Sequence, residues 1–129
     1  MKLFIGLAVV VVAIFALTFA AKDTSQTGAQ PKNMQTVQND VSAGGQLLDV
    51  RTPAEYAEGH IEGASNWSVQ RIQAGELPAV AKDKPVYVYC QSGNRSSQAT
   101  AALKAAGFTN IIDLGAMSSV QKLGGAITS

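Results

Sequence analysis

Residues 85–106 read PVYVYCQSGNRSSQATAALKAA, and this stretch decides the fold. Val86–Tyr89 combines β-branched and aromatic residues after a proline, which is typical of a strand. Cys90–Arg95 is a polar loop. From Ser96 to Ala106, apolar residues recur at helical spacing. The stretch therefore predicts a strand, a short loop and a helix.

Short apolar runs and helical patterns also alternate through the rest of the chain. The pair Thr52-Pro53 opens a helix well, and Glu55 follows the threonine at the spacing of a capping box. Strands that alternate with helices predict an α/β fold, with an open, mainly parallel sheet and helices on both faces. The other expected elements are a helix from Met34 to about Val41, strands at Gln46–Val50, Ala64–Trp67 and Asn110–Leu114, and a helical turn at Arg71–Ala74.

The N-terminus has the pattern of an export signal. Lys2 precedes an uncharged apolar run from Leu3 to Ala21, and small residues stand where cleavage after Ala20 would need them. Nineteen residues also nearly span a bilayer of about 30 Å, so a retained membrane tether through residues 3–21 stays open. We expect a signal peptide or anchor at 1–20, a flexible linker at 21–33 and one domain at 34–129.

Composition and charge narrow the possible partners. The 129 residues carry a formal net charge of +1 with interspersed charges, so we expect no nucleic-acid partner. The chain has one cysteine, so it can form no internal disulfide and no cysteine-rich zinc site.

Cys90 stands where chemistry is expected in an open α/β sheet, at the end of a strand and before a helix. Gly93 allows the loop backbone to turn its amides inward as an anion nest, and the helix start adds free N–H groups. Arg95 adds a permanent cation. These surroundings favour a thiolate, which could attack the outer sulfur of a thiosulfonate donor and carry it as a persulfide. That relay needs no metal and no organic cofactor.

Three segments of the sequence resemble the motifs of the rhodanese family. Asp49-Val50-Arg51 with Glu55-Tyr56 is similar to D-V-R-x-x-x-E-[FY], Gly59–Ala64 to G-H-I-x-G-A, and Cys90–Ser96 to the active loop C-x-x-G-x-R-S. The order and spacing agree over roughly residues 36 to 115. The exported single-domain form most resembles the phage-shock-protein-E type of rhodanese.

The resemblance implies a sulfurtransferase with a rhodanese-like fold and with Cys90 as the sulfur carrier. It implies a small-molecule sulfur donor and a thiol or cyanide acceptor. We also expect a monomer and, from the N-terminal signal, export to the periplasm. It also suggests that Asp49 and Arg51 brace the active loop, and we expect an ion pair such as Arg51 with Glu55. The loop residues implied to bind the transferred group are Gln91, Ser92, Gly93, Asn94, Arg95 and Ser96.

Two other side chains, His60 and Trp67, are interpreted as structural, and one motif departs from the family pattern. His60 belongs to a turn, and Trp67 is expected to pack in or at the rim of the core. After the last strand the family often reads L-x-G-G-x-x-x-W, but here the second glycine is Ala116 and the tryptophan is absent. We therefore expect a C-terminal helix that is short or loosely packed.

Other functions on the same architecture stay open. Phosphatases and arsenate reductases use C-x₅-R, whereas Cys90 to Arg95 is one residue shorter and suits a smaller group than a tetrahedral oxyanion. A non-catalytic binding module would be expected to lose the cysteine. A thiol redox sensor commonly uses a second cysteine, and this chain has none.

Overall fold

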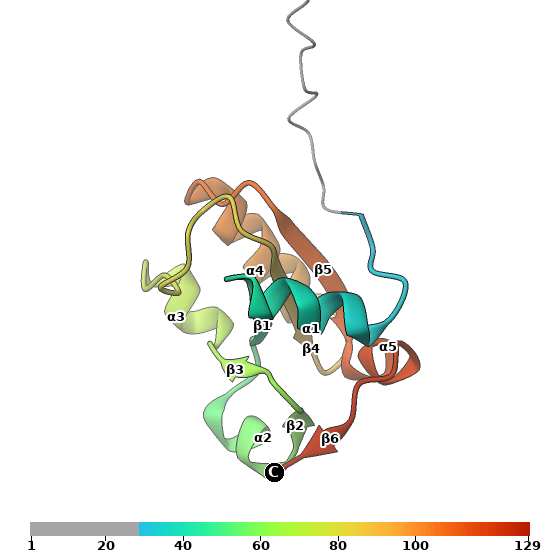
Figure 1. The fold of residues 1–129 in the computed structure, drawn as a ribbon. Helices are drawn as coiled ribbons and strands as arrows, with labels where there is room; N and C mark the ends of the chain where they lie inside the picture. The colour runs from blue at the N-terminus through green and yellow to red at the C-terminus, as the bar shows by residue number, and fades with distance from the viewer. Residues whose placement is uncertain (1–28) are drawn as a thin grey trace, which may run out of the picture.

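Four parallel strands form the central sheet in the order β3-β1-β4-β5 (Figure 1). The computed structural model describes residues 29–129, so the expected export signal and most of the expected linker lie outside the described residues. The strands alternate with helices, as the sequence predicts. Their bounds are β1 (Gln46–Asp49), β3 (Ser65–Asn66), β4 (Val86–Cys90) and β5 (Ile111–Ala116).

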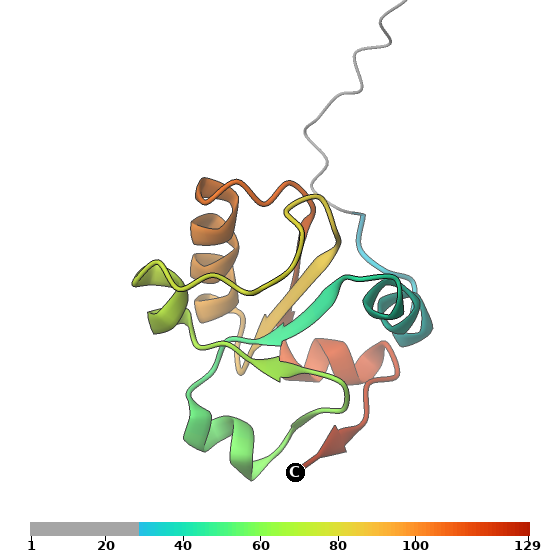
Figure 2. The same cartoon turned by 60° about the vertical axis from the view of Figure 1, so that its left-hand side comes forward.

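Helices cover both faces of this sheet, which confirms the expected fold class (Figure 2). One face carries α1 (Met34–Ser42) and α5 (Met117–Lys122), and the other carries α3 (Val69–Gln73) and α4 (Asn94–Ala105). The short helix α2 (Pro53–Glu58) follows β1.

A second, two-stranded sheet was not expected from the sequence. In it β2 (His60–Ile61) pairs antiparallel with β6 (Ile127–Thr128). A two-residue strand is too short to show the alternation of apolar and polar residues from which a strand is predicted.

Both layers of the core meet on β4. All five of its residues are buried, because helices cover each side of the strand. Side chains alternate across a strand, so Val86, Val88 and Cys90 pack in the cluster under α3 and α4, whereas Tyr87 and Tyr89 pack under α1 and α5. The strand thus delivers the Cys90 side chain to the face on which α4 lies.

The loop after β4 is shorter than the sequence suggested. Helix α4 begins at Asn94 rather than at Ser96, because Gly93 takes a φ of +98° and serves as the N-cap. That left-handed conformation lets the chain turn directly from strand to helix. The capping box at the start of α2 is confirmed, with the Thr52 side chain accepting from the Glu55 amide.

The C-terminal helix α5 is short, as expected, but it is not loosely packed. Val120 is fully buried in the cluster under α1 and α5, and it stands where the family pattern has its tryptophan. A smaller side chain therefore fills this part of the core.

The segment before α1 lies against the domain. Pro31 is buried, and the Gln30 side-chain amide donates to the carbonyl of Asp113 in β5 at 2.9 Å. Among residues 29–129 no helix is long and apolar enough to cross a membrane.

Candidate functional site

Cys90 ends β4, and the loop that follows folds back over its sulfur. The Gly93 amide donates to Cys90 Sγ at 2.9 Å, and the Ser96 hydroxyl donates to the Gly93 carbonyl at 3.0 Å. Cys90 is fully buried, yet Gln91, Ser92 and Asn94 around it are exposed. The thiol therefore lies beneath a loop at the protein surface, at the carboxyl end of the sheet.

The loop lowers the pKa of this thiol. Burial raises the pKa of Cys90, but hydrogen bonds from Ser96, Gly93 and Ser92 outweigh it and leave the pKa below its ordinary value. Donors aimed at the sulfur stabilise the thiolate, which is the nucleophilic form. Of the loop residues predicted to surround the sulfur, Ser92, Gly93 and Ser96 thus donate hydrogen bonds to Cys90.

Arg51 is held by Asp49 and reaches the active loop. Arg51 Nη2 lies 2.7 Å from Asp49 Oδ2, and both side chains are almost completely buried. Its Nη1 donates to the Gln91 side-chain oxygen at 3.3 Å, and Nη2 also donates to the Gly59 carbonyl at 2.6 Å. Burial lowers the pKa of Arg51, but Asp49 outweighs it and the pKa is raised. The guanidinium therefore links β1, the turn before β2 and the active loop.

Tyr89, which was not among the predicted site residues, also belongs to this network. The Tyr89 hydroxyl donates to Asp49 Oδ2 at 2.8 Å and accepts from the Ile61 amide at 2.9 Å. Because Tyr89 directly precedes Cys90, the bond fixes the end of β4 to the buried ion pair. A tyrosine in a buried run such as VYVY is the signal that could have found it, since a buried hydroxyl needs a partner.

The expected ion pair between Arg51 and Glu55 was wrong. Glu55 instead pairs with Arg95, with Nη1–Oε1 at 2.6 Å and Nη2–Oε2 at 2.9 Å. Arg51 instead pairs with Asp49, which is closer to it in the chain than Glu55 is. Arg95 lies in the first turn of α4, opposite Glu55 of α2, so the parallel fork fits the carboxylate.

This contact also shows how the Arg95 cation is placed. The Arg95 side chain is 29% exposed, and both of its terminal nitrogens are bound to Glu55. Glu55, first of all, raises the pKa of Arg95, and the charge of Cys90 contributes further. Arg95 thus lies within electrostatic reach of the sulfur, but its charge is shared with Glu55.

A bulge in β5 supports the other side of the loop. Val88 pairs with Asp113 but Tyr89 pairs with Gly115, so β5 has one extra residue at this point. Gly115 has a φ of +80°, and its amide donates to the Asp113 carboxylate at 2.8 Å. The bulge brings Ala116 to a β-bridge with Ser92. The bulge was not predicted, and Gly115, retained from the L-x-G-G pattern, is the residue that could have indicated it.

Trp67 lies where it was expected, whereas His60 lies in β2 rather than in the expected turn, and its contacts are structural. The His60 ring stacks on Tyr56 with centroids 3.6 Å apart, and its Nδ1 lies 2.8 Å from the Tyr56 carbonyl. Trp67 packs at the edge of the core, and the Arg71 guanidinium stacks over its ring, 3.8 Å from the ring centroid.

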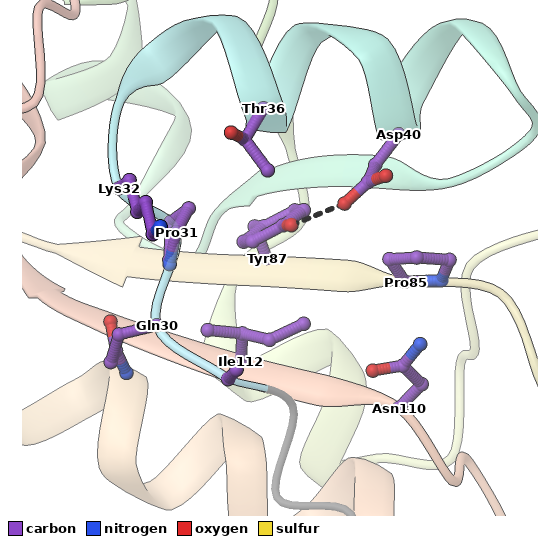
Figure 3. Close-up of a pocket in the computed structure, with 10 residues that line it drawn as sticks. Gln30, Pro31, Lys32, Thr36, Asp40, Pro85, Tyr87, Asn110 and Ile112 are labelled. Atoms are coloured by element: carbon purple, nitrogen blue, oxygen red, sulfur yellow. Dashed lines mark hydrogen bonds between the residues drawn. The ribbon is translucent and has the colours of Figure 1, made fainter.

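A separate hollow of about 390 Å³ lies between α1 and the sheet, toward the amino ends of β4 and β5. Figure 3 shows the Tyr87 hydroxyl bonded to the Asp40 carboxylate there, with Asn110 nearby on the chain entering β5. None of the described residues that line this hollow is a cysteine or a histidine. Within residues 29–129 no cluster of acidic residues, histidine and cysteine is suited to a metal ion.

Comparison with known proteins bears on this site. A family model described as the rhodanese-like domain matches residues 32–122. The uncharacterized protein YqhL of Bacillus subtilis is 42% identical over 69 residues, which cover 54% of this chain and 54% of YqhL. Thiosulfate sulfurtransferase PspE of Escherichia coli is 32% identical over 74 residues, which cover 57% of this chain and 71% of PspE.

Solved structures share the architecture as well. A structure described as rhodanese with anions from E. coli superposes with a TM-score of 0.55 at 27% identity, over 66% of this chain and 98% of that one. The matched stretch spans only about half of YqhL.

Proposed function

The chain belongs to the rhodanese-like domain family, and from that premise we propose that it is a sulfurtransferase that carries sulfane sulfur as a persulfide on Cys90. One observation carries the proposal: the amide of Gly93 donates to Cys90 Sγ at 2.9 Å, in a loop that lowers the pKa of the thiol. A structural cysteine in an apolar core would instead have a raised pKa. The name of the relative PspE supports the same reaction class.

The proposed reaction has two steps. The Cys90 thiolate attacks the outer sulfur of a thiosulfate-like donor, a Cys90–sulfur bond forms, and the donor's sulfur–sulfur bond breaks. Sulfite leaves with the electron pair of that bond. A thiol or cyanide acceptor then attacks the outer sulfur of the persulfide and returns Cys90 as a thiolate.

The loop residues of this chain would act mainly by stabilising the negative charge on the Cys90 sulfur. The same hydrogen bonds that stabilise the thiolate suit the persulfide anion, which is also a sulfur anion of single charge. Arg51, through Gln91, and the β5 bulge, through Ser92, hold the loop from two sides. The hydrogen-bond donors of the loop are therefore in place before the sulfur-donating substrate binds.

The test is thiocyanate formation from thiosulfate and cyanide by the wild type and by Cys90→Ser. We expect activity in the wild type only, because serine is not ionised at neutral pH and cannot form a persulfide. Equal rates in both proteins would contradict the proposal. Binding without turnover in the wild type would favour the non-catalytic module.

We also propose export to the periplasm, as in a phage-shock-protein-E-like rhodanese. The support is Lys2 followed by the uncharged run from Leu3 to Ala21. Cell fractionation with N-terminal sequencing tests it. A mature protein that starts at Ala21 supports a cleaved signal, and an intact Met1 in the membrane fraction supports an anchor. An intact Met1 in the soluble cytoplasm would contradict both.

A further inference from the structure

The charged side chains around Cys90 are matched with one another. Arg95 binds Glu55 through both arms of its guanidinium, at 2.6 and 2.9 Å, and Arg51 binds Asp49 at 2.7 Å. Each pair contributes one positive and one negative charge. The two arginines of the site therefore add no net positive charge beside the sulfur.

The Glu55 carboxylate stays negatively charged, and so paired with Arg95, throughout the physiological pH range. The hydrogen bond from Arg95, first of all, lowers the pKa of Glu55 to about 2. The carboxylate is therefore ionised whenever Cys90 is a thiolate, and it is present when a donor arrives.

Backbone amides of the loop also stabilise negative charge on the sulfur. A helix start and a few inward N–H groups amount to about half a unit of charge, which suits a single sulfur anion. Thiosulfate carries two negative charges, and the Arg95 cation that acts on Cys90 is already paired with the Glu55 carboxylate. A second anion in a partly buried site is repelled by that carboxylate and by the thiolate. A persulfide of a small uncharged thiol carries at most one negative charge.

We propose that Glu55 is a specificity-determining residue that favours persulfides of thiols over the thiosulfate dianion as sulfur donors. The inference rests on the proposed sulfur transfer and names its substrate class. It needs no co-reactant: the Cys90 thiolate attacks the outer sulfur of R–S–SH, a Cys90–sulfur bond forms and the R–S bond to that sulfur breaks. R–S⁻ leaves with the electron pair, and the proton stays on the transferred sulfur or passes to water.

Glu55→Gln is the variant that isolates the charge. Glutamine keeps the shape and an oxygen that can accept from Thr52 in the capping box of α2. It still offers a hydrogen-bond acceptor to Arg95. The matched control is Glu58→Gln, which removes the same charge from the same helix at an exposed position.

The experiment measures the first half-reaction alone, without an acceptor. Quenched samples are read by intact mass for the rate of Cys90 persulfide formation, with thiosulfate or with the persulfide of 2-mercaptoethanol as donor. For Glu55→Gln at low salt we expect the thiosulfate rate constant to rise about fivefold and the persulfide rate constant to change less than about twofold. Added salt should shrink the difference. Glu58→Gln should resemble the wild type with both donors.

The outcomes separate the two proposals. If the wild type forms no Cys90 persulfide with either donor, the proposed function fails. If it forms the persulfide but Glu55→Gln leaves the ratio of the two rate constants unchanged, only the role of Glu55 is overturned. Should Glu55→Gln fail to fold, Arg95→Gln tests the same charge balance. It should shift the ratio toward the persulfide donor, and an unchanged ratio would overturn the inference.

Discussion

At the scale of single residues, the site depends on which carboxylate each arginine meets. Asp49 binds Arg51 in the interior, where each charge needs a partner because both side chains are almost completely buried. Glu55 binds Arg95 nearer the surface, where an ion pair contributes little to stability but can change the charge that a ligand meets. The two pairs join the same chemical groups and differ in burial.

Arg95→Ala should affect substrate binding more than folding. We expect a higher pKa for Cys90 and a higher KM for thiosulfate, because the Cys90 charge loses a nearby cation and Glu55 is left unpaired. The free energy of unfolding should fall by about 1 kcal/mol or less, as for other partly exposed pairs. Arg95→Lys should restore only part of the effect, since lysine lacks the fork.

The measurements are the iodoacetamide alkylation rate of Cys90 against pH and steady-state kinetics with thiosulfate. An unchanged alkylation midpoint together with an unchanged KM would show that Arg95 does not act on the sulfur. Activation would then come from the loop amides and the helix start alone.

At the scale of elements, the junction of β4 and α4 depends on the backbone of Gly93. Its φ of +98° both begins the helix and turns an amide toward Cys90. An added Cβ would meet Gly115 Cα at 3.7 Å, an ordinary contact, so space is not the obstacle to a side chain there. The obstacle is the left-handed conformation itself.

Gly93→Ala should therefore cost about 1–2 kcal/mol of stability and raise the pKa of Cys90. Gly75→Ala is the matched control, because Gly75 has a φ of +87° and open space around it but lies in the turn after α3. We expect a similar loss of stability there, measured by urea denaturation. The alkylation midpoint of Cys90 should move only in Gly93→Ala. A shift of equal size in Gly75→Ala would show that the effect is not local to the loop.

The elements also show what the sequence could predict. The buried run VYVY and the capping residues Thr52 and Glu55 are local signals, so β4 and the start of α2 were predicted correctly. The β2–β6 pairing and the partner of Glu55 depend on segments far apart in the chain. Spacing along a sequence cannot show which of two nearby arginines a carboxylate reaches. The start of α4 was placed late because Gly93 was interpreted as a loop residue rather than as a helix cap.

At the scale of the whole molecule, the fold provides a buried sheet whose carboxyl end holds one cysteine. The sheet is covered on both faces, so Cys90 is fixed by core packing on the α4 side and by the loop above it. The network from Tyr89 through Asp49 and Arg51 to Gln91 connects the core to that loop. The fold therefore holds the loop in position through these contacts.

The central claim is that Cys90 carries the transferred sulfur, and peptide mass spectrometry after incubation with thiosulfate tests it most directly. We predict that the Cys90 peptide of the wild type gains the mass of one sulfur atom and loses it when cyanide is added. The corresponding peptide of Cys90→Ser should keep its mass throughout. A wild-type Cys90 peptide that remains unmodified while thiocyanate is still formed would contradict the account.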